Sequence, residues 1–89
     1  MKLKQGLVYR QIAGKHIVIP TGDNIADFNG IINLNETAAF LWQKLRDGGS
    51  EDQLIAALQD EFEVDALQAR QGVAAFLQDM RELNAIVED

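Results

Sequence analysis

The sequence predicts an α+β domain in which a three-stranded antiparallel sheet precedes three helices, in a winged helix-turn-helix-like arrangement. Up to residue 34, short segments rich in β-branched and aromatic residues alternate with turn residues, as strands do. From residue 36 onward, apolar residues recur at spacings of three and four, as on amphipathic helices. Strands grouped before helices indicate an α+β fold, and the last two helices are close enough in sequence to form a helix-turn-helix pair.

The predicted sheet begins with a hairpin. Residues 7–12 form its first strand. Residues 15–19 form the second strand after an Ala-Gly turn, and Pro20 ends it because proline has no N–H to donate. A polar loop over residues 21–29 follows, and we expect Phe28 to anchor it to the core.

The third strand, over residues 30–34, leads directly into the first helix. Asn35 is suited to cap this helix, and Glu36 would lie at the positive end of its dipole. The helix is predicted over residues 36–46 and ends before a pair of glycines. It carries Trp42, the only tryptophan of the chain, and helical spacing places this side chain in the core rather than on a ligand platform.

Both remaining helices begin with capping-box patterns. Ser50 and Gln53 open the second helix, whose apolar face contains Leu54, Ile55, Leu58 and Phe62. Asp65 and Gln68 open the third and longest helix, whose core stripe contains Ala69, Val73, Phe76, Leu77 and Met80. Residues 86–87 either add a short terminal strand or pack against the core.

The length and composition indicate one globular domain over residues 1–89, with a modest core. An apolar content of 47% argues against disorder, and no apolar run approaches the roughly 20 residues of a membrane span. The first residues lack the apolar stretch of a signal peptide, and the absence of cysteine excludes disulfides and cysteine-based metal sites. We therefore expect a cytoplasmic protein with no membrane partner.

Charge is distributed unevenly along the chain. Residues 1–46 have a net charge of +3, from six basic and three acidic side chains. Residues 47–89 contain two basic and eleven acidic side chains, so that their net charge is −9 and that of the chain is −6. Nucleic-acid binding depends on basic side chains that neutralise phosphates. The acidic half argues against a nucleic-acid partner and indicates a solvated face.

No residue pattern indicates a catalytic or metal site. His16 is the only histidine, and it lies in a predicted strand without a second histidine or a cysteine. Adjacent carboxylates at residues 51–52 and 60–61 are explained by helix starts and solvated helix ends. Residues 60–65 lack the glycine and the ligand spacing of a calcium loop. We therefore expect a protein that is not an enzyme and that has no cofactor and no bound metal.

One part of the chain resembles a family signature. It reads Leu34-Asn35-Glu36-Thr37, then Phe40-Leu41-Trp42, Leu45 and Asp47-Gly48. The similarity continues in Val73, Phe76-Leu77, Met80 and Ala85-Ile86-Val87, so that it covers most of the chain. The pattern resembles the PqqD family of small peptide chaperones, also called recognition elements for the precursors of ribosomally synthesised, modified peptides (RiPPs). Ala38 and Gly72 depart from the family pattern, which usually has glycine and often an acidic residue there.

The resemblance implies the same winged helix-turn-helix fold and a non-catalytic function. Family members bind the leader region of a precursor peptide by strand addition and present it to a modifying enzyme, such as a radical SAM maturase. The product would be the cofactor PQQ or another RiPP. The peptide lies in a groove between the third strand and the third helix. The strand side of the site would then consist of Gly30, Ile31, Ile32, Asn33 and Leu34.

Periodicity predicts the helix side of the site. A stripe beside the core stripe contains Leu67, Arg70, Ala74, Leu77, Gln78 and Arg81. Its two arginines would pair with acidic residues of a leader peptide, or they form pairs on the helix surface instead. Gly72 lies in the same helix and would permit close approach by a neighbouring helix or by a ligand.

Two other functions stay open. A winged helix can bind DNA, although the third helix opens with an acid and apolar residues instead of basic ones. An exposed strand edge and the exposed apolar residues of a small domain could also join two copies into a homodimer.

Overall fold

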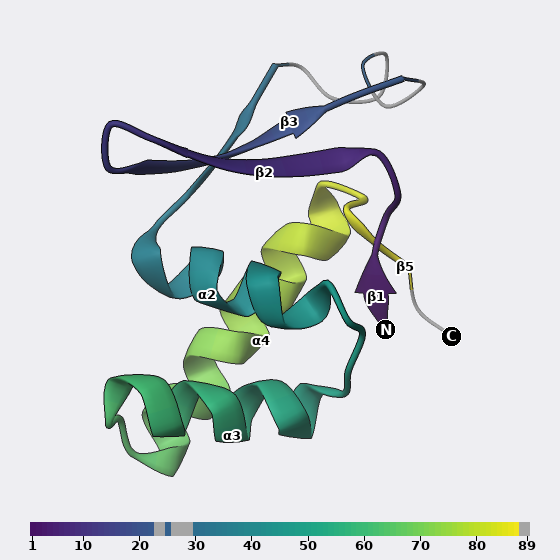
Figure 1. Ribbon diagram of the computed structural model, residues 1–89. Helices are drawn as coiled ribbons and strands as arrows, with labels where there is room; N and C mark the ends of the chain where they lie inside the picture. The colour runs from purple at the N-terminus through teal and green to yellow at the C-terminus, as the bar shows by residue number, and fades with distance from the viewer. Residues whose placement is uncertain (23–24, 26–29, 88–89) are drawn as a thin grey trace.

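The computed structural model describes residues 1–22, 25 and 30–87, and it has the predicted α+β fold (Figure 1). A three-stranded sheet contains β2 (Leu7–Ile12), β3 (Lys15–Pro20) and β4 (Ile32–Leu34). It precedes the helices α2 (Glu36–Leu45), α3 (Glu51–Phe62) and α4 (Ala66–Glu82). A two-stranded sheet joins β1 (Lys2–Leu3) to β5 (Ile86–Val87). In Figure 1 the three-stranded sheet lies above the helices, with α2 between the sheet and α3.

The three-stranded sheet is antiparallel, with the order β2-β3-β4. β2 and β3 form the predicted hairpin. Ala13 and Gly14 between them have φ values of +52° and +79°, and a two-residue type I′ turn requires positive φ at both positions. β4 pairs with the other edge of β3, where Asn33 lies opposite Ile17. β3 is therefore the central strand.

β4 is shorter than the strand predicted over residues 30–34. Gly30 has a φ of +89°, in a region that glycine adopts readily and other residues do not, so the extended backbone does not begin there. Pairing starts at Ile32, which lies opposite Val18. The predicted role of Phe28 as a core anchor falls outside the described residues.

The pairing of β1 with β5 brings the first residues of the chain beside residues 86–87 (Figure 1). Of the two predictions for residues 86–87, the strand is confirmed. Leu3 lies opposite Ile86, and the Lys4 N–H donates to the Ala85 carbonyl at 2.8 Å. Sequence reasoning missed β1, because a two-residue strand has no alternation to detect and forms only with a partner distant in sequence.

The three predicted N-caps are all present. The Asn35 side chain accepts a hydrogen bond at 2.8 Å from the backbone N–H three residues further on. Ser50 with Gln53, and Asp65 with Gln68, form complete capping boxes. Each cap satisfies N–H groups that the first turn of a helix otherwise leaves unpaired. These local pairs determine where α2, α3 and α4 begin.

One hydrophobic core joins the inner face of the sheet to α2, α3 and α4. Its largest fully buried side chains are Trp42, Leu41, Leu45, Leu77, Val18 and Val73. Trp42 is only 1% exposed, which confirms the prediction that it is a core residue. None of the helices in the described part of the chain is long and apolar enough to cross a membrane.

Candidate functional site

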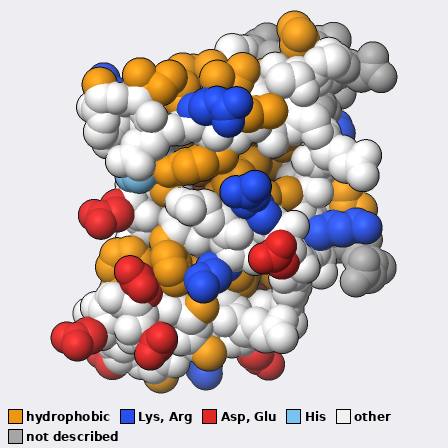
Figure 2. Space-filling view, in the orientation of Figure 1, with side chains coloured by type: hydrophobic (Ala, Val, Ile, Leu, Met, Phe, Trp, Pro, Cys, Tyr) orange, Lys and Arg blue, Asp and Glu red, His pale blue; other side chains and the backbone are white. Residues whose placement is uncertain are grey.

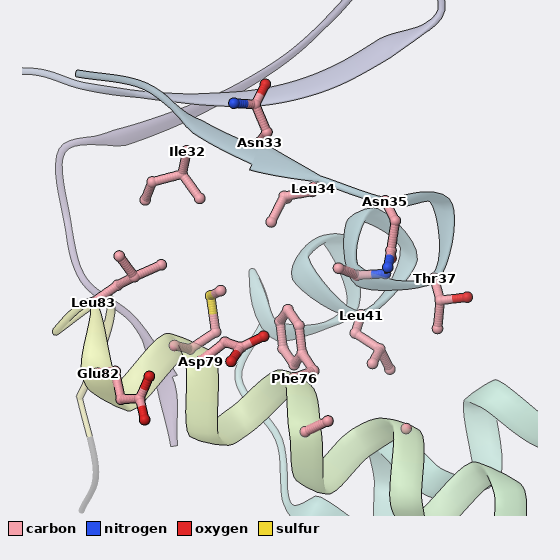
Figure 3. A pocket seen from close by; sticks show the side chains of 14 residues that line it. Ile32, Asn33, Leu34, Asn35, Thr37, Leu41, Phe76, Asp79, Glu82 and Leu83 are labelled. Carbon is pink, nitrogen blue, oxygen red and sulfur yellow. The ribbon is translucent and has the colours of Figure 1, made fainter. Parts of the chain in front are cut away.

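A groove of about 650 Å³ lies between β4, the start of α2 and α4 (Figure 3). Its volume is in the range that is typical of ligand pockets. The residues that line it from β4 and α2 are Ile32, Asn33, Leu34, Asn35, Thr37, Ala38 and Leu41. Those that line it from α4 and the end of that helix are Gly72, Ala75, Phe76, Asp79, Met80, Glu82 and Leu83.

The floor of the groove is apolar. Ile32 and Leu34 project from β4 towards α4, whereas Asn33 between them projects away, as strand alternation requires (Figure 3). Phe76 and Met80 line the groove from α4, and Figure 3 shows the Phe76 ring on the side of the groove opposite β4. These four apolar side chains are between 2% and 9% exposed, so the core around them holds the floor in place before any ligand binds.

The groove borders an unpaired edge of β4. β3 pairs with one edge of β4, and within the described residues no strand pairs with the other edge. All three residues of β4 line the groove and no residue of β3 does, so the groove lies on the unpaired side. A free edge presents N–H and C=O groups that an extended peptide can bind as an added strand. The geometry is therefore suited to main-chain recognition of a peptide.

The α4 wall of the groove is acidic. Asp79 and Glu82 line it about one helical turn apart, and both side chains are exposed. Gln78 Nε2 donates to Glu82 Oε1 at 3.5 Å, the outer limit of a hydrogen bond. The polar side chains on the facing walls are asparagine and threonine, and no described lysine or arginine lines the groove. The groove therefore carries negative charge on one side and none on the other.

The structure brings three of the five predicted strand residues to the groove, namely Ile32, Asn33 and Leu34. Gly30 and Ile31 precede β4 and do not line the groove. Ile31 is 51% exposed, so it offers apolar surface before the strand begins. Peptide contact by these five residues stays a prediction.

The structure does not bring the predicted helix residues to the groove. Leu77 is fully buried in the core, and the other five are exposed on α4 away from the lining: Leu67, Arg70, Ala74, Gln78 and Arg81. A core stripe on a helix has two flanks. The stripe predicted from the sequence lies on one flank, and the groove lies on the other. Gly72, Ala75 and Asp79 recur at spacings of three and four on the flank that does line it. Peptide contact by the six predicted residues stays an untested prediction.

Arg70 and Arg81 therefore contribute no positive charge to the groove lining. Arg81 lies in the last turn of α4, where a cation interacts favourably with the helix dipole. Arg70 is exposed near the middle of the same helix. These positions agree better with the helix-surface alternative than with pairing to a peptide in this groove.

His16 takes part in a contact between β2 and β3. Its Nδ1 atom lies 2.6 Å from the Tyr9 hydroxyl oxygen, and the two rings are stacked with centroids 6.0 Å apart. This contact gives His16 a structural role in the hairpin. Among the residues that the structure describes, no group of three His, Cys, Asp or Glu side chains is placed to hold a metal ion.

Two solved structures share this fold. The structure of TbiB1 in complex with the TbiA(beta) leader peptide has a TM-score of 0.77 and 16% identity, and the similarity covers 100% of both chains. The structure of lasso peptide synthetase B1 complexed with the leader peptide has a TM-score of 0.76 and 24% identity, with 98% of this chain and 96% of that chain covered. No curated protein matches the sequence significantly. At these identities the likeness shows the fold alone.

A protein-family model described as coenzyme PQQ synthesis protein D (PqqD) matches residues 16–86. The matched range runs from β3 to β5, so it contains β4, the three helices and every residue that lines the groove. It also contains the segment from Leu34 to Trp42 that carries the resemblance in the sequence. The chain therefore belongs to the PqqD family.

Proposed function

We propose that this chain binds the leader region of a precursor peptide in the groove between β4 and α4, and presents that peptide to a modifying enzyme. The observation that carries the proposal is the unpaired edge of β4 beside an apolar floor. Main-chain hydrogen bonds to the edge would hold the peptide extended, and alternate side chains would contact the floor between Ile32 and Phe76. Family membership supports the proposal, as do two relatives in fold that are bound to leader peptides.

Most of the affinity should come from side-chain contacts. β4 has only three residues, so strand addition supplies few main-chain hydrogen bonds, each of which contributes about 1 kcal/mol net. The apolar floor and Leu83, which is 38% exposed at the end of α4, offer the remaining contact surface. A leader peptide should therefore combine an extended segment with apolar residues at alternate positions.

In this proposal the chain contributes no chemistry of its own. By holding the peptide near the modifying enzyme, it raises the effective concentration of the substrate. That enzyme would be a radical SAM maturase in PQQ synthesis or the maturase of another RiPP. The chain should therefore speed modification at low precursor concentration, and mass spectrometry should find the peptide unmodified when it is incubated with the chain alone.

A titration of isotope-labelled protein with the leader regions of precursor peptides, taken from any precursor gene that neighbours this one, tests the binding step by NMR. Amide resonances of residues 32–34 and 75–83 should shift. Peptides methylated on successive backbone nitrogens should lose affinity at every second position, because only alternate N–H groups of an added strand face β4. The absence of shifts in β4 and α4 with any such peptide would overturn the proposal.

A matched pair of variants locates the contact surface. Ala74 and Ala75 are both exposed on α4, but only Ala75 lines the groove. Ala75→Gln should obstruct the groove and weaken binding about tenfold, which corresponds to about 1.4 kcal/mol, whereas Ala74→Gln should leave affinity unchanged. A loss with Ala74→Gln alone would instead place the peptide on the flank that the sequence predicted.

A further inference from the structure

We propose that Asp79 and Glu82 select leader peptides in which a lysine or arginine stands beside the apolar residues that contact the floor. The inference rests on the proposed function, because it concerns the peptide bound in the same groove. It reverses the charge preference predicted from the sequence, in which Arg70 and Arg81 would pair with acidic residues of the peptide.

The two carboxylates lie beside the apolar floor. Figure 3 shows Asp79 next to Phe76, with Glu82 nearer the end of α4 beside Leu83. Because residues three apart on a helix share a face, both acids belong to one wall. A peptide whose apolar side chain enters the floor therefore has neighbouring side chains within reach of a carboxylate.

Both acids are unfavourably placed for the stability of the chain itself. They lie in the last turn of α4, where the helix dipole disfavours negative charge, and like charges three residues apart repel. Among the described residues, the hydrogen bond from Gln78 to Glu82 is the one polar side-chain contact of either carboxylate. In the part of the chain that the structure describes, no lysine or arginine lines the groove beside the two carboxylates. A cationic ligand in the groove would offset both effects.

Lysine and arginine fit this arrangement better than any small cation. Their long aliphatic stems can lie on apolar surface while the charged group stays in solvent. A stem packed beside Phe76 would therefore bring its charge to Asp79 at the rim. Acidic residues at the same position would be repelled, and the polar side chains on the facing wall are neutral asparagine and threonine, which cannot neutralise them.

Selection of random peptides displayed on phage tests this charge preference without knowledge of the natural leader. The full chain is compared with the variant Asp79→Asn/Glu82→Gln and with the control Asp60→Asn/Glu61→Gln. Asp60 and Glu61 are exposed on α3 and do not line the groove, so the control makes the same change in net charge elsewhere.

The wild-type chain and the control should both select peptides with lysine or arginine beside apolar residues. Peptides selected on Asp79→Asn/Glu82→Gln should keep the apolar residues and lose the basic ones. Replacing the basic residue of a selected peptide by glutamine should weaken its binding to the wild-type chain about three- to tenfold, because exposed ion pairs are individually weak. The same replacement in the peptide should have little effect on its binding to the variant Asp79→Asn/Glu82→Gln.

Salt dependence of wild-type binding provides a second measurement that needs no protein variant. Affinity for a lysine-containing peptide should fall as salt is added, and affinity for its glutamine counterpart should fall much less. Equal enrichment of basic residues on all three proteins, or enrichment of acidic residues, would overturn the inference and leave the proposed function intact. If Ala75→Gln does not weaken the binding of any selected peptide, or if no peptide is selected at all, both this inference and the proposed function are overturned.

Discussion

The Cδ2 atom of Leu58 lies 3.5 Å from the position that a Cβ atom on Gly72 would occupy. This distance is an ordinary van der Waals contact, so the packing of α4 against α3 does not require glycine at position 72. Gly72 also lines the groove, where the absence of a side chain leaves room for a ligand. The structure therefore favours close approach by a ligand as the reason for this glycine within a helix.

Gly72→Ala should stabilise the fold and weaken peptide binding. Alanine is favoured over glycine in a helix interior by about 1 kcal/mol, so the free energy of unfolding in urea should rise by up to that amount. The added methyl group should narrow the groove and lower peptide affinity several-fold in a calorimetric titration. Ala74→Gly, on the flank away from the groove, should lower the stability and leave the peptide affinity unchanged. Unchanged binding by Gly72→Ala would contradict this role for Gly72.

Asn35→Ala should destabilise the start of α2. The variant removes the side-chain oxygen that accepts the Ala38 N–H at 2.8 Å, and the loss of an N-cap typically costs about 1 kcal/mol. Circular dichroism during urea unfolding measures the change. Asn35→Ser retains a capping oxygen and should remain close to the wild-type stability. Equal stability of the alanine and serine variants would show that the cap contributes little.

Trp42→Ala should strongly lower the free energy of unfolding of the whole domain. The side chain is 1% exposed in the centre of the core, and removal of a buried tryptophan costs about 3–5 kcal/mol. That is a large part of the roughly 5–15 kcal/mol that stabilises a typical domain. Trp42→Phe should cost less, and because Trp42 does not line the groove, its folded form should bind peptide normally. Weakened binding by a well-folded Trp42→Phe would indicate that Trp42 acts on the ligand.

Tyr9→Phe should weaken the contact between β2 and β3. It removes the hydroxyl group that lies 2.6 Å from His16 Nδ1, and a hydrogen bond of this kind contributes about 0.5–1.5 kcal/mol net. A double-mutant cycle with His16→Phe, followed by thermal unfolding, isolates the interaction between the two side chains. A coupling energy near zero would show that the hydrogen bond does not stabilise the hairpin.

Features that depend on neighbouring residues were predictable from the sequence. The caps at Asn35, Ser50 and Asp65 each act over three residues, so the starts of α2, α3 and α4 could be read directly from the residue pattern. The hairpin between β2 and β3 is equally local, because two residues form its turn. The order of these elements then indicated the α+β fold.

Features that depend on distant partners were not predictable. β1 exists only because Leu3 meets Ile86. The late start of β4 depends on the left-handed conformation of Gly30 and on where β3 offers pairing partners. Neither effect leaves a pattern in the local sequence.

The sequence by itself determined the family, the strand that borders the groove and the helix that faces it. Only the tertiary structure decided which flank of α4 lines the groove, because apolar periodicity identifies the core stripe and is symmetrical about it. The way α4 packs against β4 and α2 turns Asp79 and Glu82 into the groove and leaves Arg70 and Arg81 outside its lining. Packing of distant segments therefore determines the sign of the charge that a bound peptide would meet.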